Sequence, residues 1–144
     1  MEKFIIDRWD KNKKLLEKYF KETPQGNYSS YENIVKAIID KVINPQEDEE
    51  ETILTKKFSN NITVIDDGDY QGCQLFIIAQ KIYQPSPTDY LITNTYYGSC
   101  SGCDTLIGIQ NFEEGLPTEE QVSQYMTLSL HLIQKMKFIY SEEE

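Results

Sequence analysis

The chain has 144 residues, of which 39% are hydrophobic and 12% aromatic, and its formal net charge at pH 7 is −10. This length is typical of one domain and is sufficient for a hydrophobic core without disulfides, and the apolar and aromatic content argues against intrinsic disorder. The acidic charge argues against direct binding of nucleic acid, because the phosphate backbone repels such a surface.

The first part of the chain shows helical periodicity. Apolar residues recur at spacings near 3.6 across residues 4–22, and the Pro and Gly that follow predict the end of this helix. A second helix is predicted to begin at a capping box formed by Ser29 and Glu32 and to end at Asn44-Pro45. The short connection favours an antiparallel helical hairpin.

The second part shows short strand-like runs and then a helix. Residues 62–65, 73–79 and 90–97 predict three strands of an antiparallel meander, with a further strand piece within residues 53–58. Residues 73–79 are apolar at nearly every position, which is typical of a central strand covered on both faces. A helical turn is expected at residues 105–109.

A long C-terminal helix is predicted to begin with a capping box of Thr118 and Gln121 and to reach Ile139. The whole pattern therefore predicts a single α+β domain over residues 1–144, with an N-terminal helical hairpin, a three- to four-stranded antiparallel meander and a C-terminal long helix. Residues 45–52 are expected to form an acidic linker loop, and residues 141–144 a frayed acidic tail.

Two loops are expected to meet at one end of the meander, because consecutive strands usually lie side by side. These loops are residues 66–72 and residues 98–104, and both are rich in Gly and Asp. Their polar side chains predict a binding site that consists of Asp66, Asp67, Asp69, Tyr70, Tyr97, Ser99 and Asp104.

The same corner gathers all three cysteines of the chain. The spacing of Cys100 and Cys103 is one by which two thiolates bind zinc, with Cys73 as a third ligand and His131 or Asp104 as a fourth. A second Cys-x-x-Cys pair is absent, so the alternative is that the cysteines pack as small buried side chains between two Gly-rich turns. A redox role is less favoured, since the meander lacks a βαβ unit.

The motifs Asp66-Asp67-Gly68-Asp69-Tyr70-Gln71-Gly72 and Tyr97-Gly98-Ser99-Cys100-Ser101-Gly102-Cys103-Asp104-Thr105 resemble those of a group of small, uncharacterised phage and prophage proteins, mostly of Gram-positive bacteria. The likeness covers most of residues 62–138. The group carries no assigned activity, so no functional residue is transferred. The resemblance implies an accessory protein that works in the bacterial cytoplasm, and the sequence shows neither a signal peptide nor an apolar run of membrane-spanning length.

These observations predict a non-enzymatic protein that acts by protein–protein interaction, for example by inhibiting a bacterial host or defence factor. The expected partner is a host protein with a basic surface, which would complement the acidic chain. No phosphate-binding loop is present, and the single histidine limits catalytic pairs. The alternative is a metal- or thiol-dependent small enzyme or ligand-binding module that uses Cys73, Cys100, Cys103 and Asp104.

Overall fold

The chain forms helices first, then three strands, and then further helices before a last short strand. A computed structural model describes residues 3–24, 30–46, 56–69, 71–99, 104–109 and 115–139. Its helices are α1 (Lys3–Glu22), α2 (Tyr31–Ile38), α3 (Thr105–Ile109) and α4 (Glu119–Gln134). Its strands are β1 (Thr63–Asp66), β2 (Gly72–Ala79), β3 (Tyr90–Tyr97) and β4 (Lys137–Phe138). A π-helical turn, η1 (Ile39–Ile43), follows α2, and a 3-10 turn, η2 (Pro87–Asp89), precedes β3.

The four strands form one antiparallel sheet in the order β1-β2-β3-β4. The predicted meander and the predicted α+β class are therefore confirmed. The long pairing runs from Gly72 opposite Tyr97 to Ala79 opposite Tyr90, so the start of β2 lies beside the end of β3. Residues 53–55 of the expected strand piece lie outside the described residues, and Phe58 at its end forms an isolated bridge with Gln80.

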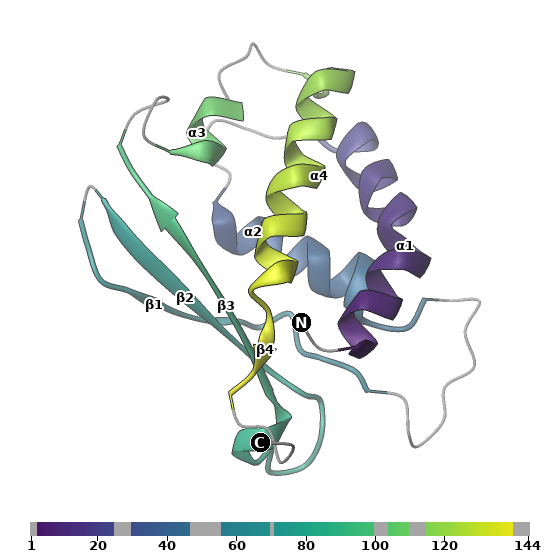
Figure 1. The fold of residues 1–144 in the computed structure, drawn as a ribbon, viewed down its shortest axis with the longest axis vertical. Coiled ribbons are helices and arrows are strands. Elements are labelled where there is room, and N and C mark those ends of the chain that lie inside the picture. The colour runs from purple at the N-terminus through teal and green to yellow at the C-terminus, as the bar shows by residue number, and fades with distance from the viewer. Residues whose placement is uncertain are drawn as a thin grey trace.

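Helices pack on one face of this sheet, which we call the inner face (Figure 1). The side chains of Phe76, Ile78, Leu91 and Thr93 alternate along β2 and β3 and are buried on this face. The Thr93 hydroxyl donates a 2.7 Å hydrogen bond to the carbonyl oxygen of Leu132 in α4, which fixes the helix over β3. Alternation along the strands places the neighbouring residues on the opposite face.

The core lies between the inner face and the helices α1, α2 and α4. As the helical period predicts, Leu16 and Phe20 of α1 are fully buried, while Trp9 is partly buried against the core. The ring of Phe20 stacks on that of Tyr125 in α4 with centroids 5.0 Å apart. Burial raises the pKa of Tyr125 to about 12, and its hydroxyl has no hydrogen-bond partner among the described residues.

The end of η1 is held by two side chains of α1. The Asn12 side-chain amide donates to the Val42 carbonyl at 2.9 Å, and the Arg8 guanidinium donates to the carbonyls of Ile43 and Asn44 at 3.1 and 2.9 Å. The last carbonyls of a helix lack partners within the helix, so such donors satisfy them. The start of α1 therefore lies at the end of η1, which agrees with the antiparallel hairpin.

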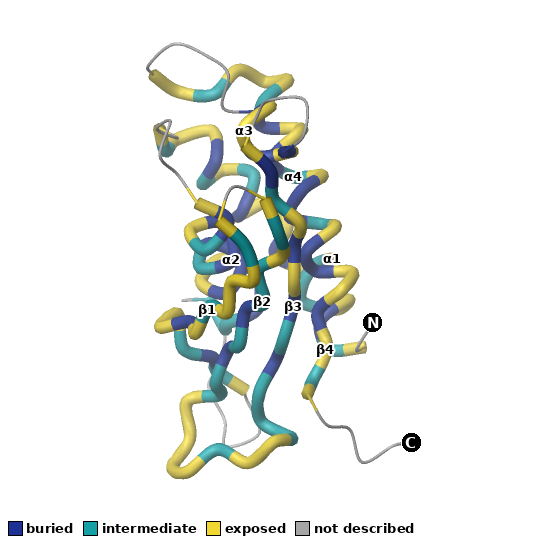
Figure 2. The backbone as a smooth tube through the Cα atoms, turned by 90° about the vertical axis from the view of Figure 1, so that its left-hand side faces the viewer, coloured by how far each residue is buried: buried dark blue, intermediate teal, exposed yellow. Residues whose placement is uncertain are grey.

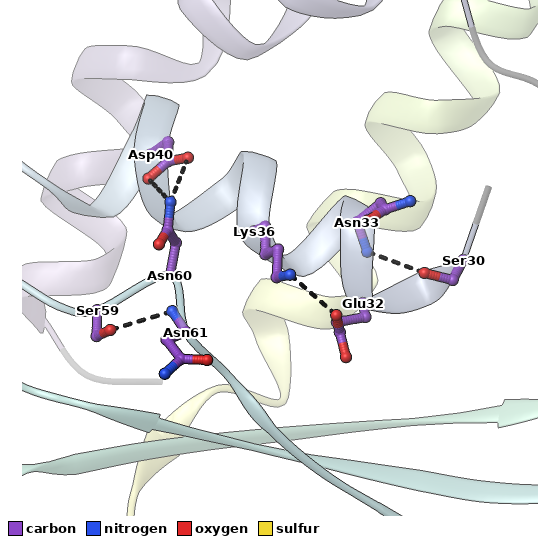
Figure 3. Close-up of polar contacts among 8 residues, drawn as sticks. All are labelled: Ser30, Glu32, Asn33, Lys36, Asp40, Ser59, Asn60 and Asn61. Carbon is purple, nitrogen blue, oxygen red and sulfur yellow. Dashed lines mark hydrogen bonds and ion pairs between the residues drawn. The ribbon is translucent and has the colours of Figure 1, made fainter.

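The predicted cap of the second helix is wrong by one residue. The N-cap is Ser30, whose hydroxyl accepts a 3.3 Å hydrogen bond from the backbone N–H of Asn33 (Figure 3). Glu32 instead forms an ion pair of 3.0 Å with Lys36, one turn further along the helix. Ser29 lies outside the described residues. Because Ser29 and Ser30 are both good caps, the sequence does not distinguish them.

The predicted cap of the C-terminal helix is confirmed, but its predicted end is wrong. Thr118 and Gln121 form the reciprocal capping box, whereas α4 ends at Gln134 and the chain then forms β4. Phe138 pairs opposite Leu91 and stacks on the ring of Phe4 with centroids 5.6 Å apart. Pairing with β3 and burial of this ring compensate for the lost helical turn.

No described helix is both long enough and apolar enough to cross a membrane. The acidic linker and the acidic tail lie largely or wholly outside the described residues, so both stay predictions.

We expect Asn12→Ala to lower the free energy of unfolding by about 1–3 kcal/mol, because it leaves the Val42 carbonyl without its buried donor. Urea denaturation would measure the change. Lys13→Ala, on the exposed side of the same turn, is the control and should change stability by less than about 0.5 kcal/mol. Equal effects of the two substitutions would contradict the assigned role of Asn12.

Candidate functional site

The loop between β1 and β2 forms a tight turn that is closed by its own aspartates. The backbone N–H of Asp67 donates to the Cys73 carbonyl at 3.2 Å, and the Asp67 carboxylate accepts from the Cys73 N–H at 2.6 Å. The turn requires glycine at residue 68, because a Cβ atom there would lie 1.9 Å from the Gln71 carbonyl oxygen. The aspartates of this loop therefore organise its backbone.

The end of β3 lies against this loop, as the sequence predicts. The Tyr97 hydroxyl lies 2.5 Å from Asp66 Oδ1 and 2.7 Å from the Gly68 carbonyl oxygen, so its single proton is shared between two acceptors. Asp66 also accepts hydrogen bonds from the Gly68 N–H and from the Gln74 side chain. One tyrosine thus joins the end of β3 to a loop about thirty residues earlier in the sequence.

The hydrogen bond between Tyr97 and Asp66 shifts both pKa values. The bond lowers the pKa of Asp66 below its usual 3.8 and is the largest cause that raises the pKa of Tyr97 to about 12. The negative charges of Asp67 and Asp69 contribute a smaller part of the rise at Tyr97. Asp66, Asp67 and Asp69 therefore form one exposed group around the Tyr97 hydroxyl, which we call the acidic hairpin.

Asp104 is turned away from the acidic hairpin and is buried, with only 6% of its surface exposed. Its Oδ1 accepts hydrogen bonds from the Tyr31 hydroxyl at 2.6 Å and from the Ile107 N–H at 3.2 Å. Its Oδ2 accepts a hydrogen bond from the Gly98 N–H at 2.7 Å. The Tyr31 oxygen in turn accepts the Leu106 N–H at 3.1 Å. Burial, followed by the bond to Asp104, raises the pKa of Tyr31 above its ordinary 10.0. Asp104 is therefore a structural link between α2, α3 and β3.

The remaining predicted site residues are only partly described. Ser99 and the Cys73 side chain are exposed, whereas Tyr70, Cys100 and Cys103 lie outside the described residues. His131 lies on α4 beside a small cavity of about 190 Å³ that Thr95, Tyr96 and Lys135 also line.

Within the described residues, no group of three or more Cys, His, Asp or Glu side chains is placed to hold a metal ion. The zinc hypothesis therefore stays a prediction that depends on Cys100 and Cys103. The three hydrogen bonds to the Asp104 carboxylate make this residue a poor fourth ligand.

The second face of the sheet, which we call the outer face, is not part of the site predicted from the sequence. No described helix packs on it, and its residues are half-buried or exposed (Figure 2). Ile65 and Tyr96 are 51% and 59% exposed. By strand alternation the outer face comprises Thr63, Ile65, Cys73, Leu75, Ile77, Ala79, Tyr90, Ile92, Asn94 and Tyr96.

The sequence carries a signal for this face in the apolar residues of β2. Residues 73–79 are apolar on both faces, from which coverage of both faces was predicted. The described helices lie on the inner face, and the side chains on the second face of β2 are half-buried or, at Cys73, exposed. This part of the prediction is wrong for the residues that the structure describes.

Comparison of the chain with models of protein families, with curated proteins and with solved structures finds no match. The resemblance to phage and prophage proteins stays a prediction.

We expect Tyr31→Phe to lower the free energy of unfolding by about 1–3 kcal/mol, since the Asp104 carboxylate and the Leu106 N–H each lose a buried partner. The stability of the wild-type protein should also fall as pH rises above 10.0, because unfolded Tyr31 then ionises while folded Tyr31 keeps its proton. Denaturation at a series of pH values would show a smaller alkaline loss in Tyr31→Phe. Tyr83→Phe, at a side chain that is 90% exposed, is the control for both measurements.

We expect Asp66→Asn to move the pKa of Tyr97 from about 12 towards 10.0, because the substitution weakens the hydrogen bond that is the largest cause of the shift and also removes the neighbouring charge. NMR titration of the tyrosine ring carbons would follow the change. In the control Asp69→Asn the pKa should stay near 12, since the charge of Asp69 is a minor cause. A Tyr97 pKa that is the same in Asp66→Asn and wild type would contradict the hydrogen bond.

Proposed function

We propose that this protein is a non-enzymatic accessory protein of phage type, which binds a host protein in the bacterial cytoplasm through the outer face of its sheet and thereby inhibits a host or defence factor. The observation that carries this proposal is the apolar character of a sheet face that no described helix covers.

The outer face has the composition of a binding surface. Its centre consists of half-buried Leu75, Ile77 and Ile92 on the two longest strands, and exposed Ile65 and Tyr96 lie at its sides. Single exposed apolar residues are normal on protein surfaces, but a contiguous group on a flat sheet indicates an interaction site. A large aromatic side chain such as Tyr96 is a typical centre of binding energy.

Charge indicates the chemistry of the partner. The acidic hairpin lies at the end of the sheet where β1 turns into β2, and the chain as a whole carries a net charge of −10. A complementary partner would present an apolar patch next to basic side chains. Such charges accelerate association and make it sensitive to salt.

The aspartates of the two predicted loops support a role in binding rather than in catalysis. The carboxylates of Asp66, Asp67 and Asp104 accept hydrogen bonds from backbone N–H groups and hold loop conformations. Groups used in this way support a fixed surface shape, which is what recognition by a rigid partner needs.

We expect immobilised wild-type protein to capture one stoichiometric partner from a lysate of a Gram-positive bacterium, and Tyr96→Ala to weaken the binding of that partner at least tenfold, or roughly 1.4 kcal/mol. The control is Tyr83→Ala, at an exposed tyrosine in the connection between β2 and β3, which should bind as the wild type does.

Binding should also weaken as salt is added, because the proposed partner is basic. The proposal fails if no stoichiometric partner is captured, or if the two tyrosine variants lose the partner equally.

A further inference from the structure

A cavity of about 190 Å³ lies between β3 and α4, at the part of β3 that β4 does not reach. The short strand β4 pairs with Leu91 and Ile92, which lie at the start of β3. Towards its end β3 instead faces the last turn of α4, and Thr95 and Tyr96 line the cavity on this side. The cavity is separate from the acidic hairpin, and of the outer face only Tyr96 lines it.

The lining of this cavity is apolar on its floor and basic at its rim. Leu128 and Leu132 of α4 are buried and form the floor. His131 and Lys135 are exposed and lie at the rim. None of the described residues that line the cavity is an aspartate or a glutamate. The chain has 24 acidic residues and 14 lysines and arginines, so a cavity whose charged lining is wholly basic differs from the surface as a whole and favours an anion.

The rim has hydrogen-bond donors to offer a ligand. The Lys135 ammonium lies 3.4 Å from the Asn94 carbonyl oxygen, which is longer than an ordinary N–H···O hydrogen bond of about 2.7–3.2 Å. An ammonium has three N–H donors and no acceptor, so this contact leaves at least two of them for an anion. His131 lies one turn earlier along α4, and its imidazole adds a ring N–H at the same rim.

A buried hydroxyl without a good partner lines the same cavity. Thr95 is only 6% exposed, and among the described residues its hydroxyl contacts just the Tyr96 carbonyl oxygen, at 3.4 Å. O–H···O hydrogen bonds normally measure about 2.5–3.0 Å, so this buried group is poorly satisfied. Thr93, on the same face of β3, instead donates to the Leu132 carbonyl at 2.7 Å. A ligand oxygen in the cavity would give Thr95 the partner that Leu132 gives Thr93.

The backbone of β3 contributes one more donor at this edge. The Tyr90 carbonyl accepts from the Ile139 N–H and the Asn94 carbonyl faces Lys135, so both point away from β2. Backbone groups alternate in direction along an antiparallel strand, so the Tyr96 N–H points to the same side. No described strand pairs with β3 on that side at this residue. The donors around the cavity therefore come from both a strand and a helix.

We propose that this cavity binds a small organic carboxylate. The carboxylate oxygens accept hydrogen bonds from Thr95, His131 and Lys135, and the apolar part of the ligand lies on the two leucines of the floor. An organic acid fits this lining better than an inorganic anion, because the floor offers no hydrogen bond and is stabilised by contact with an apolar chain. The net charge of −10 repels anions from the surface in general, so the attraction comes from these local donors. This inference goes beyond the proposed function, because it assigns a ligand to a different site.

The test is an NMR titration of the full, isotope-labelled chain with hexanoate at neutral pH. We expect the amide signals around Thr95 and His131 to shift, with a dissociation constant on the order of 1 mM, as is reasonable for a ligand of this size. Hexanamide has the same chain without the charge, and inorganic phosphate has a charge without the chain. Each should bind at least about tenfold more weakly than hexanoate. Equal binding of phosphate would mean an adventitious ion only, and equal binding of hexanamide an apolar contact only, and either result overturns the inference.

Variants assign the binding to the cavity. Lys135→Gln should weaken hexanoate binding at least about fivefold, because it removes the charge at the rim. The control Lys137→Gln removes the same charge at an exposed residue that does not line the cavity, so it should bind as the wild type does. Thr95→Val keeps the shape of the side chain without its hydroxyl and should weaken binding at least about threefold in a protein that stays folded.

Two further results overturn the inference. One is a wild-type spectrum that does not change with hexanoate up to roughly 50 mM, far above the expected dissociation constant. The other is an equal loss of binding in Lys135→Gln and Lys137→Gln. None of these variants alters the outer face, so capture of a host partner and binding of the carboxylate can each fail without the other.

Discussion

A single buried carboxylate fixes how the helices sit over the sheet. Asp104 directly precedes α3. Its two carboxylate oxygens accept hydrogen bonds from the backbone N–H groups of Gly98 and Ile107 and from the hydroxyl of Tyr31 at the start of α2. A buried carboxylate is costly unless its acceptor sites are filled, so these partners have to stay together. The end of β3, the start of α3 and the start of α2 are therefore held at one point.

The opposite end of α2 is fixed by α1 through a comparable use of polar side chains. Asn12 and Arg8 bind the last carbonyls of the π-helical turn η1, and Asn44 then pairs its side-chain amide with both backbone groups of Phe58. The Asp40 carboxylate also accepts from the side chain of Asn60 (Figure 3). The helical layer is thus tied at both ends, once to the exit of β3 and once to the segment that leads into β1.

Patterns among neighbouring residues correctly predicted the features that depend on neighbouring residues, such as helical periods, helix caps and the order of consecutive strands. The period of α1, the capping box at Thr118 and the meander all follow from neighbours in sequence, and the meander in turn predicted that Tyr97 would lie beside the loop that begins at Asp66. The direction of Asp104, the π-helical turn and the short strand β4 depend on contacts between distant residues. Such contacts leave no periodic or capping signal in the sequence. The hydrogen-bond partner of Asp104, Tyr31, for example, lies 73 residues away from it.

The apolar residues of β2 show why a sequence does not specify what covers a surface. A strand that is apolar on both faces has to be covered twice to keep its side chains from water, but the second cover need not belong to the same chain. Here the described helices pack on the inner face, and Leu75 and Ile77 lie on the other. The pattern that predicted a doubly covered strand therefore supports the proposal that another molecule covers this face. In the function proposed above, the outer face, rather than the acidic hairpin alone, would therefore contact the partner.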